Sequence, residues 1–410
     1  MKKLLFGTTA LLAAGAFVST AQASDPIKLS LGGYMEYWGA AASQDGDFNK
    51  TNRVNNFDIQ GEGEVWFMGK TTLDNGLTIE VRVELENGSN NNGNDIIDEV
   101  YMTLSGKYGQ AIIGSTNDVA YKSQVDAPEA SYIGGAYPSS ESDTIQYLLI
   151  PGQNGTSVNT GSGVKGTNTG VDLLDVKMNV LSDQNKISYY TPILYGFQGG
   201  VSYIPSNNSG GDDTTDAVKG GTWGTNTNSE GINKAATFDD AWAFSLTYNN
   251  TFSGVGVKAT TGYIMIDDSA LSGAGVAHVH NQDTLVQEFA AGLNLTYKGF
   301  TLGGGAKRRI ANVDTSMAAT DGYAWDLGVM YAEGPYAVSF NYSKSSVVGD
   351  RATAGNDKVD EYRIGGSYTL GPGVILFSQL AYLDAKDESG IATAGNEGAY
   401  GGVVGLRLNF

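Results

Sequence analysis

The chain has 410 residues, no cysteine, 57 glycines, 23 tyrosines and a formal net charge of −19. The absence of cysteine excludes a small extracellular domain held together by disulfides. The acidic charge argues against nucleic acid as a partner, because the phosphate backbone is itself negative.

The N-terminus has the pattern of a secretory signal peptide. Lys2 and Lys3 precede an apolar run that ends at Val18, and Ala21–Ala23 offers a cleavage site of the small-x-small type. We expect residues 1–23 to be removed after export, which takes away two lysines and changes the charge from −19 to −21. No later stretch has the run of about 18 apolar residues that a membrane-spanning helix needs.

The mature chain, 24–410, alternates apolar and polar residues with a period of two, which indicates strands with one apolar face. The clearest strand is 77–86, and Asp74-Asn75-Gly76 before it has the sequence of a tight hairpin turn. In chain order, the predicted strands are 27–38, 57–70, 77–86, 96–105, 108–115, 185–192, 195–204, 238–250, 253–266, 284–297, 299–311, 321–333, 335–345, 358–370, 373–385 and 398–410.

The last of these strands has the features of a membrane-spanning strand. Its apolar face is about ten residues long and carries aromatic rings at both ends, Tyr400 and Phe410. A tilted strand of this length crosses the hydrocarbon core of a bilayer, and terminal rings suit the two interfaces. Because unpaired backbone groups are too costly in lipid, such a strand must belong to a closed barrel.

The connections between the strands alternate in length, with short turns on one side and long loops on the other. An even number of strands with alternating connections is typical of an up-and-down membrane barrel. The predicted fold class is therefore all-β: a 16-stranded antiparallel transmembrane β-barrel. A barrel of this size is too wide for its own side chains to fill, so its interior is an aqueous channel. A soluble secreted β-protein is the structural alternative, but it does not explain the strand count.

The chain resembles the general diffusion porins of the Gram-negative outer membrane. The segments that carry the resemblance are Tyr101–Tyr108 with Gly109–Gly114, Asn185–Pro192 with Gly196-Phe197, the hairpin Tyr362–Leu383, and Phe410. The resemblance implies a homotrimer in the cell outer membrane, surrounded by lipid and lipopolysaccharide, that passes ions and small hydrophilic solutes. It also implies that Phe410 is the signal for the outer-membrane assembly machinery. The long third loop, about 116–184, is expected to fold into the lumen as a constriction.

The predicted pore-lining residues follow from this resemblance and from strand alternation. The loop carboxylates expected at the constriction are Asp118, Asp126, Glu129, Glu141 and Asp143. The residues expected on the pore wall are Arg82, Lys307, Arg309, Arg363, Arg407, Glu62, Glu80, Glu84 and Glu361. Ser115 and Ser188 stand where relatives often carry arginine, so we predict a channel that favours cations.

Other function classes find less support in the sequence. A substrate-selective channel for a sugar or a carboxylate would need rings or bases along the lumen, and alternation points most rings outward. No enzyme is predicted and no catalytic residue is assigned: both histidines, His278 and His280, lie in one loop, and no nucleophile elbow is present. No cofactor is predicted. Structural Ca²⁺ held by carboxylates of Asn87–Asp98 or of the third loop is a further option, with its ligands unknown.

Overall fold

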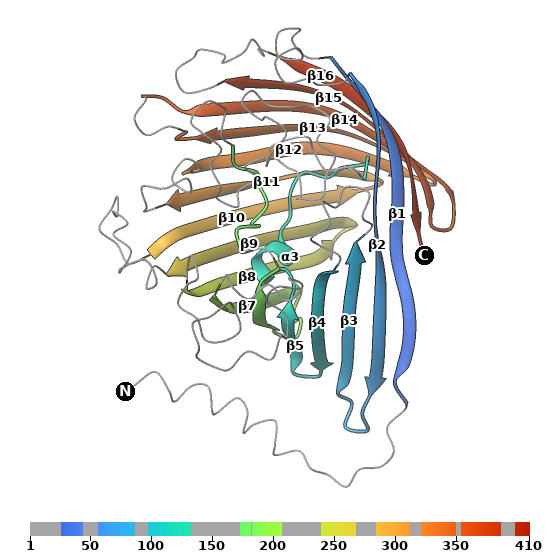
Figure 1. Ribbon diagram of the computed structural model, residues 1–410, viewed down its shortest axis with the longest axis vertical. Helices are drawn as coiled ribbons and strands as arrows, with labels where there is room; N and C mark the ends of the chain where they lie inside the picture. Colours follow the sequence, from blue (N-terminus) through green and yellow to red (C-terminus); the bar gives the residue numbers. More distant parts are fainter. Residues whose placement is uncertain are drawn as a thin grey trace.

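The computed structural model describes residues 26–43, 56–86, 97–132, 173–181, 183–206, 239–267, 284–311, 321–349, 354–386 and 398–410. The strands form one closed antiparallel barrel in which each strand pairs with its neighbours in the sequence and β1 pairs with β16 (Figure 1). The predicted 16-stranded barrel is thereby confirmed. None of the helices in the described segments is both long and apolar enough to cross a membrane.

The strands vary in length around the barrel. Their bounds are β1 (Lys28–Ser43), β2 (Phe57–Thr72), β3 (Thr78–Glu86), β4 (Ile97–Gly106), β5 (Gly109–Ser115), β6 (Asn185–Tyr190), β7 (Phe197–Ser206), β8 (Asp239–Phe252), β9 (Val255–Asp267), β10 (Thr284–Tyr297), β11 (Phe300–Ala311), β12 (Gly322–Glu333), β13 (Tyr336–Val347), β14 (Asp357–Gly371), β15 (Val374–Lys386) and β16 (Ala399–Asn409). The short helix α3 (Val119–Ser123) follows β5. The strands β3 to β6 are the shortest part of the wall, with 9, 10, 7 and 6 residues.

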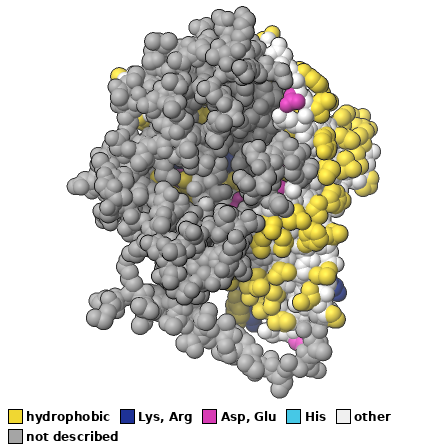
Figure 2. All heavy atoms as spheres, in the orientation of Figure 1, with side chains coloured by type: hydrophobic (Ala, Val, Ile, Leu, Met, Phe, Trp, Pro, Cys, Tyr) yellow, Lys and Arg dark blue, Asp and Glu magenta, His cyan; other side chains and the backbone are white. Residues whose placement is uncertain are grey.

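Side chains alternate between the outside and the inside of the barrel. In β15, Phe377 and Gln379 are buried, whereas Leu376 and Leu380 are 41% and 62% exposed. Hydrophobic side chains gather on the described outer surface (Figure 2). This is the surface that a barrel presents to lipid, with its polar groups directed inward.

Tight turns connect the strands at one end of the barrel. The turns after β8 and β10 each have two successive residues with positive φ, Ser253-Gly254 and Lys298-Gly299. Two such residues in a row are the requirement of a type I′ hairpin, whose twist matches that of the strands. In the predicted Asp74-Asn75-Gly76 turn, Gly76 has φ +82° and donates its N–H to Leu73 O at 2.8 Å.

The last residue of the chain closes the barrel. The N–H of Phe410 donates to Gly33 O, and Phe410 O accepts from the N–H of Gly33, each at 3.0 Å. Gly33 has φ +149°, and a Cβ there would lie 2.1 Å from Glu64 O. A glycine is therefore required where β1 meets both β2 and β16.

A β-bulge changes which side chains of β4 face inward. The register of the β3–β4 pair shifts between Val83 and Leu85, and β4 holds the extra residue. Strict alternation from Tyr101 would turn Asp98 outward. In the structure, carboxylate oxygens of Asp98, Glu64 and Glu84 lie within 4.8 Å of one another.

Candidate functional site: the third loop and the lumen wall

The third loop runs into the lumen directly after β5. Its outgoing segment, residues 116–132, crosses the inner wall from β7 to β15 and bonds to side chains of β7, β8, β9, β12, β13 and β15. The bonds are Val119 N to Ser202 Oγ (3.0 Å), Ser123 Oγ to Ser245 Oγ (3.1 Å), Val125 N to Thr260 Oγ1 (3.1 Å), Ala127 N to Asp326 Oδ1 (3.1 Å), Asn341 Nδ2 to Pro128 O (2.8 Å), Ala130 N to Ser339 Oγ (3.0 Å) and Gln379 Nε2 to Ser131 Oγ (3.0 Å). Short polar side chains on the inner face thus pair the backbone of the loop, which has no strand partner of its own.

Glycines on the inner face leave the room that this close approach requires. A Cβ on any of them would meet the outgoing segment: at Gly292 it would lie 1.8 Å from Val125 O, at Gly305 2.8 Å from Val125 O, at Gly328 3.1 Å from Ala127 Cβ, and at Gly365 2.1 Å from Glu129 Oε1. We call these four residues the glycine track. They let the loop lie directly on the strand backbone, because glycine has no side chain to hold it away.

The returning segment, residues 173–181, lies beside the outgoing one. Gln124 joins the two: its Oε1 accepts from Met178 N at 2.9 Å, and its Nε2 donates to Val176 O. The N–H of Leu174 also donates to Ser345 Oγ of β13 at 2.8 Å. Leu173, Leu174, Met178 and Leu181 are fully buried against inward side chains of the wall. Apolar burial therefore holds this part of the loop in place.

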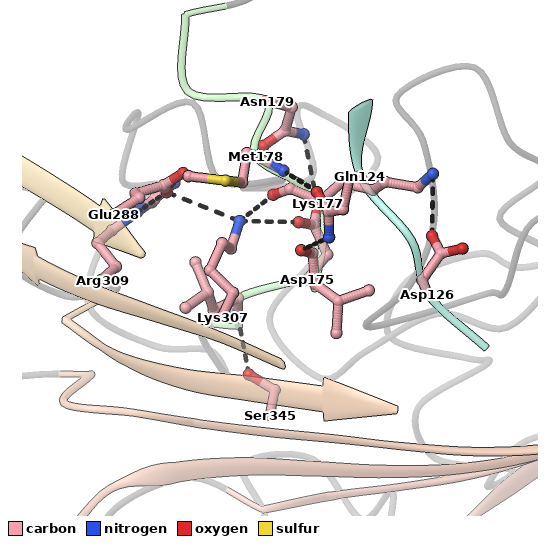
Figure 3. A network of polar contacts seen from close by, with 12 residues as sticks. Gln124, Asp126, Asp175, Lys177, Met178, Asn179, Glu288, Lys307, Arg309 and Ser345 are labelled. Atoms are coloured by element: carbon pink, nitrogen blue, oxygen red, sulfur yellow. Dashed lines mark hydrogen bonds and ion pairs between the residues drawn. The ribbon is translucent and has the colours of Figure 1, made fainter. Parts of the chain in front are cut away.

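A buried ion network fixes the returning segment to the wall (Figure 3). Lys307 Nζ lies 3.1 Å from Asp175 Oδ1 and 3.6 Å from Glu288 Oε1, and it also donates to Lys177 O. Arg309 Nη2 lies 2.5 Å from the same Glu288 oxygen. The side chains of Lys307, Asp175, Glu288 and Arg309 are all 0–1% exposed. Burial raises the pKa of Asp175, and the nearby Lys307 opposes that rise.

The predicted constriction carboxylates Asp126 and Glu129 also contact cations. Asp126 Oδ2 lies 2.9 Å from Lys177 Nζ, so it links the outgoing segment to the returning one. Glu129 Oε1 accepts from Ser339 Oγ at 2.8 Å, and Glu129 Oε2 lies 3.8 Å from Arg363 Nε of β14. Both carboxylates are partly exposed, at 27% and 18%.

Asp118 has a structural position at the entry of the loop. It is the N-cap of α3, where its Oδ1 accepts from Ala120 N at 2.7 Å and Tyr121 N at 3.1 Å. Burial raises its pKa to about 6, against the opposing charge of Lys186. Asp118 is 1% exposed and cannot meet a solute directly. Glu141 and Asp143 lie outside the described residues.

The facing wall, which we define as β16 and β1 to β4, carries a different set of groups. Arg82 lies 2.5 Å from Glu84, and its guanidinium carbon is 4.1 Å from the ring centroid of Trp66. Arg407 lies 3.0 Å from Glu36, and its guanidinium carbon is 3.9 Å from the ring centroid of Tyr34. Each arginine therefore has a carboxylate at its edge and an aromatic ring against its face.

Two lysines of the third loop have the same surroundings. Lys122 Nζ is 3.5 Å from Glu99 and 5.0 Å from the ring centroid of Tyr101. Lys177 Nζ, paired with Asp126, is 5.9 Å from the ring centroid of Tyr121. The combination of one cation, one ring and one carboxylate thus recurs at four places in the lumen.

The remaining predicted wall residues fall into two groups. Glu361 lies under the loop with Arg363, at 3.8 Å. On the facing wall, Glu62 accepts from Tyr34 Oη at 2.5 Å, and Glu80 pairs with Lys70 at 3.2 Å. The structure therefore brings Lys307, Arg309, Arg363 and Glu361 together beneath the loop, away from Arg82, Arg407, Glu62, Glu80 and Glu84.

This arrangement differs from the one that the resemblance implied. The resemblance implies basic residues on the wall opposite the acidic loop, yet Lys307 contacts the loop directly, and both Lys307 and Arg309 are buried beneath it. No role for the rings of Tyr34 and Trp66 was predicted from the sequence. The alternation of side chains could have placed both rings in the lumen, because Tyr34 and Trp66 occupy the polar face of their strands.

Comparisons with known proteins agree with the barrel. Residues 7–388 match the profile of the family described as Gram-negative porin. Uncharacterized proteins of Rickettsia conorii and Rickettsia felis are 21% and 22% identical over 347 and 346 residues, covering 76% of this chain and 73% of theirs.

Solved structures show the same fold at low sequence identity. An anion-selective porin from Comamonas acidovorans has a TM-score of 0.57 at 15% identity, covering 94% of this chain and 100% of its own. A loop-deletion mutant of OmpT, an outer membrane protein of Vibrio cholerae, has a TM-score of 0.53 at 11% identity, with coverages of 94% and 100%. A triple mutant of the Rhodopseudomonas blastica porin has a TM-score of 0.51 at 14% identity, with coverages of 93% and 100%. With a family match over nearly its whole length and a closed 16-stranded barrel, the chain belongs to the Gram-negative porins.

Proposed function

We propose that this outer-membrane porin is a passive, water-filled channel for ions and small hydrophilic solutes, and that it favours cations. The proposed passage runs between the outgoing segment of the third loop and the facing wall. The supporting observation is the segregation of charge: bases beneath the loop are buried against carboxylates, while the facing wall keeps an excess of carboxylates.

The position of the passage is supported by the exposure of inward-facing groups. On the facing wall, Glu80, Arg82 and Arg407 have side chains that are 31%, 22% and 21% exposed. Tyr132, at the end of the outgoing segment, is 49% exposed. A side chain on the inner face of a closed barrel reaches water in the lumen or at its two mouths.

The charge of the facing wall supports the preference for cations. Its described inner face carries the carboxylates Glu36, Asp58, Glu62, Glu64, Glu80, Glu84, Glu86, Asp98 and Glu99, against the cations Lys28, Lys70, Arg82 and Arg407. Lys122 of the loop adds one more positive charge. Carboxylates around a narrow passage with low-dielectric walls raise the local concentration of cations and lower that of anions.

The reversal potential of the purified protein in a planar bilayer under a KCl gradient tests this proposal. We expect stepwise, ohmic conductance and a potential of the sign that K⁺ permeation gives. Glu80→Gln should reduce the cation preference, whereas Glu333→Gln, on an exposed side chain at the end of β12, should leave it unchanged. A potential of the opposite sign would reject the cation preference, and a folded barrel without conductance would reject the channel.

We also propose that the protein is a homotrimer whose contacts lie on the face formed by β3 to β6. A six-residue strand such as β6 is only about 20 Å long even before tilt, which is too short for the apolar band of a barrel. The outward side chains of this face are aliphatic, including Val81, Met102, Ile113 and Ile187, which are 40–56% exposed in a single chain. Neighbouring copies of the chain would shield the short strands β3 to β6 from lipid.

The other functions considered gain less from the structure. A sugar-selective channel needs open ring faces, yet the faces of Trp66 and Tyr34 are covered by Arg82 and Arg407. Cleavage after Ala23, recognition of Phe410 by the assembly machinery, contact with lipopolysaccharide and structural Ca²⁺ stay predictions. Determining the N-terminus of the mature protein tests the first of these.

A further inference from the structure

The two arginines of the facing wall lie on either side of a pair of rings. Tyr34 and Trp66 are in contact edge to face, with ring centroids 6.3 Å apart and an interplanar angle of 63°. Arg407 covers Tyr34 at 3.9 Å, and Arg82 covers Trp66 at 4.1 Å. The guanidinium groups of Arg82 and Arg407 thus each lie on an aromatic ring and beside a carboxylate of this wall.

Glu64 lies between the positions of Arg82 and Arg407. It accepts from Trp66 Nε1 at 2.5 Å and from Tyr34 Oη at 3.2 Å. Among the described residues, no cation lies within ion-pair distance of Glu64, in contrast to Glu84 and Glu36. Glu64 is therefore a carboxylate that accepts from the polar groups of two rings and, among the described residues, has no cation beside it.

We propose that the group formed by Tyr34, Glu64 and Trp66, the wall station, binds the guanidinium group of a permeating solute. This inference rests on the proposed function, since the solute reaches the station through the channel. A guanidinium group presents parallel N–H donors that match a carboxylate. The chain's own Arg82 and Arg407 pair with Glu84 and Glu36 within the same wall.

The surrounding charges favour a cation over other solutes. Carboxylate oxygens of Glu84 and Asp98 lie within 4.8 Å of those of Glu64, so an added positive charge relieves their mutual repulsion. The same three carboxylates repel an anion. A sugar finds the ring faces of the station already covered, as described above. Tyr132, at the end of the outgoing segment, is 49% exposed, and its ring centroid lies 5.9 Å from the Arg407 guanidinium carbon.

The test compares two solutes of nearly the same shape that differ in one charge. Single-channel KCl currents are recorded at pH 7 with increasing L-arginine or with L-citrulline, whose side chain replaces the guanidinium by a neutral urea group. We expect arginine to reduce the current with a saturating concentration dependence and citrulline to leave it unchanged. L-Lysine, which carries the same charge without the planar fork, should act only at higher concentration.

Two substitutions test whether arginine reduces the current by binding at the wall station. Glu64→Gln keeps the size of the side chain and should raise the half-blocking concentration of arginine about fivefold, which is typical of losing one partly exposed ion pair. Trp66→Phe keeps a ring but removes the N–H that orients Glu64, and should raise it by a smaller factor. Asp58→Asn is the matched control, because Asp58 lies on the same face of the same strand, away from the rings, and is exposed.

The outcomes separate this inference from the proposed function. A conducting channel in which arginine and citrulline act alike, or in which lysine blocks as strongly as arginine, would overturn the wall station and leave the porin intact. Equal effects of Glu64→Gln and Asp58→Asn would overturn its location. The absence of any conductance would reject the proposed function and the wall station together.

Discussion

Gly292 sets how closely the third loop approaches the barrel wall. It lies on the inner face of β10, and a Cβ at this position would be 1.8 Å from Val125 O. Val125 O is a backbone atom and the position of a Cβ is fixed by the backbone, so neither atom can rotate away as the end of a flexible side chain would. The loop can therefore keep its position only while residue 292 has no side chain.

We predict that Gly292→Ala lowers the single-channel conductance. The new methyl group pushes the outgoing segment off β10 and toward the facing wall, which narrows the proposed passage. The control is Gly256→Ala on the inner face of β9, where the nearest atom to a new Cβ is 3.6 Å away. If both variants conduct like the original protein, the loop does not set the width of the passage.

At the scale of single residues, the sequence predicts whether a side chain points into or out of the barrel, but not which residues that side chain contacts. Alternation places Arg82 and Lys307 on the inner face of their strands, because the side-chain period of a strand is two. It gives no information on what either residue touches: Lys307 meets Asp175, which is 132 positions away along the chain. Asp98 shows a second limit, because a single extra residue in β4 turns it inward.

At the scale of elements, the returning segment depends on its buried ion network. Lys307 lies within ion-pair distance of both Asp175 and Glu288, and Arg309 pairs with Glu288. Removing one partner from such a site leaves an uncompensated buried charge, which costs far more than an exposed pair contributes.

We predict that Lys307→Met destabilises the protein by about 3 kcal/mol, as is typical for breaking a buried ion pair. The double variant with Asp175→Asn should recover much of this loss, because the unpaired carboxylate is removed as well. Urea unfolding in detergent, followed by tryptophan fluorescence, measures the effect. Lys386→Met is the control: Lys386 is 61% exposed in its pair with Asp384, so its loss should cost less than about 1 kcal/mol. A loss for Lys307→Met no larger than for the control would contradict a structural role of the network.

The third loop is also where sequence-based prediction has the least information. Its length followed from the strand pattern and its entry into the lumen from the family resemblance, but its path along β7 to β15 depends on hydroxyl and glycine positions on separate strands. Such residues have no distinctive local pattern, because glycine and serine are frequent throughout this chain. The strands themselves were predictable, since each has its own alternation.

At the scale of the whole molecule, the short wall from β3 to β6 bears on assembly. We predict that the detergent-solubilised protein has the mass of three chains by light scattering, and that Val81→Lys on β3 reduces it to that of one. A lysine there would be buried between copies without a partner. Leu302→Lys on the outer face of β11, where the wall is long, should leave the trimer intact. Dissociation by Leu302→Lys, but not by Val81→Lys, would place the contacts on another face.

The attachment of the third loop to one side of the barrel also has a mechanical consequence. The outgoing segment bonds to β7, β8, β9, β12, β13 and β15, so one stretch of chain runs across these strands like a brace inside a cylinder. Bending that part of the wall requires these bonds to stretch together, whereas the wall from β1 to β3 carries no such series of bonds among the described residues. The barrel is therefore stiffer on the side that the third loop crosses than on the facing wall. Lateral pressure from the bilayer bends mainly the facing wall.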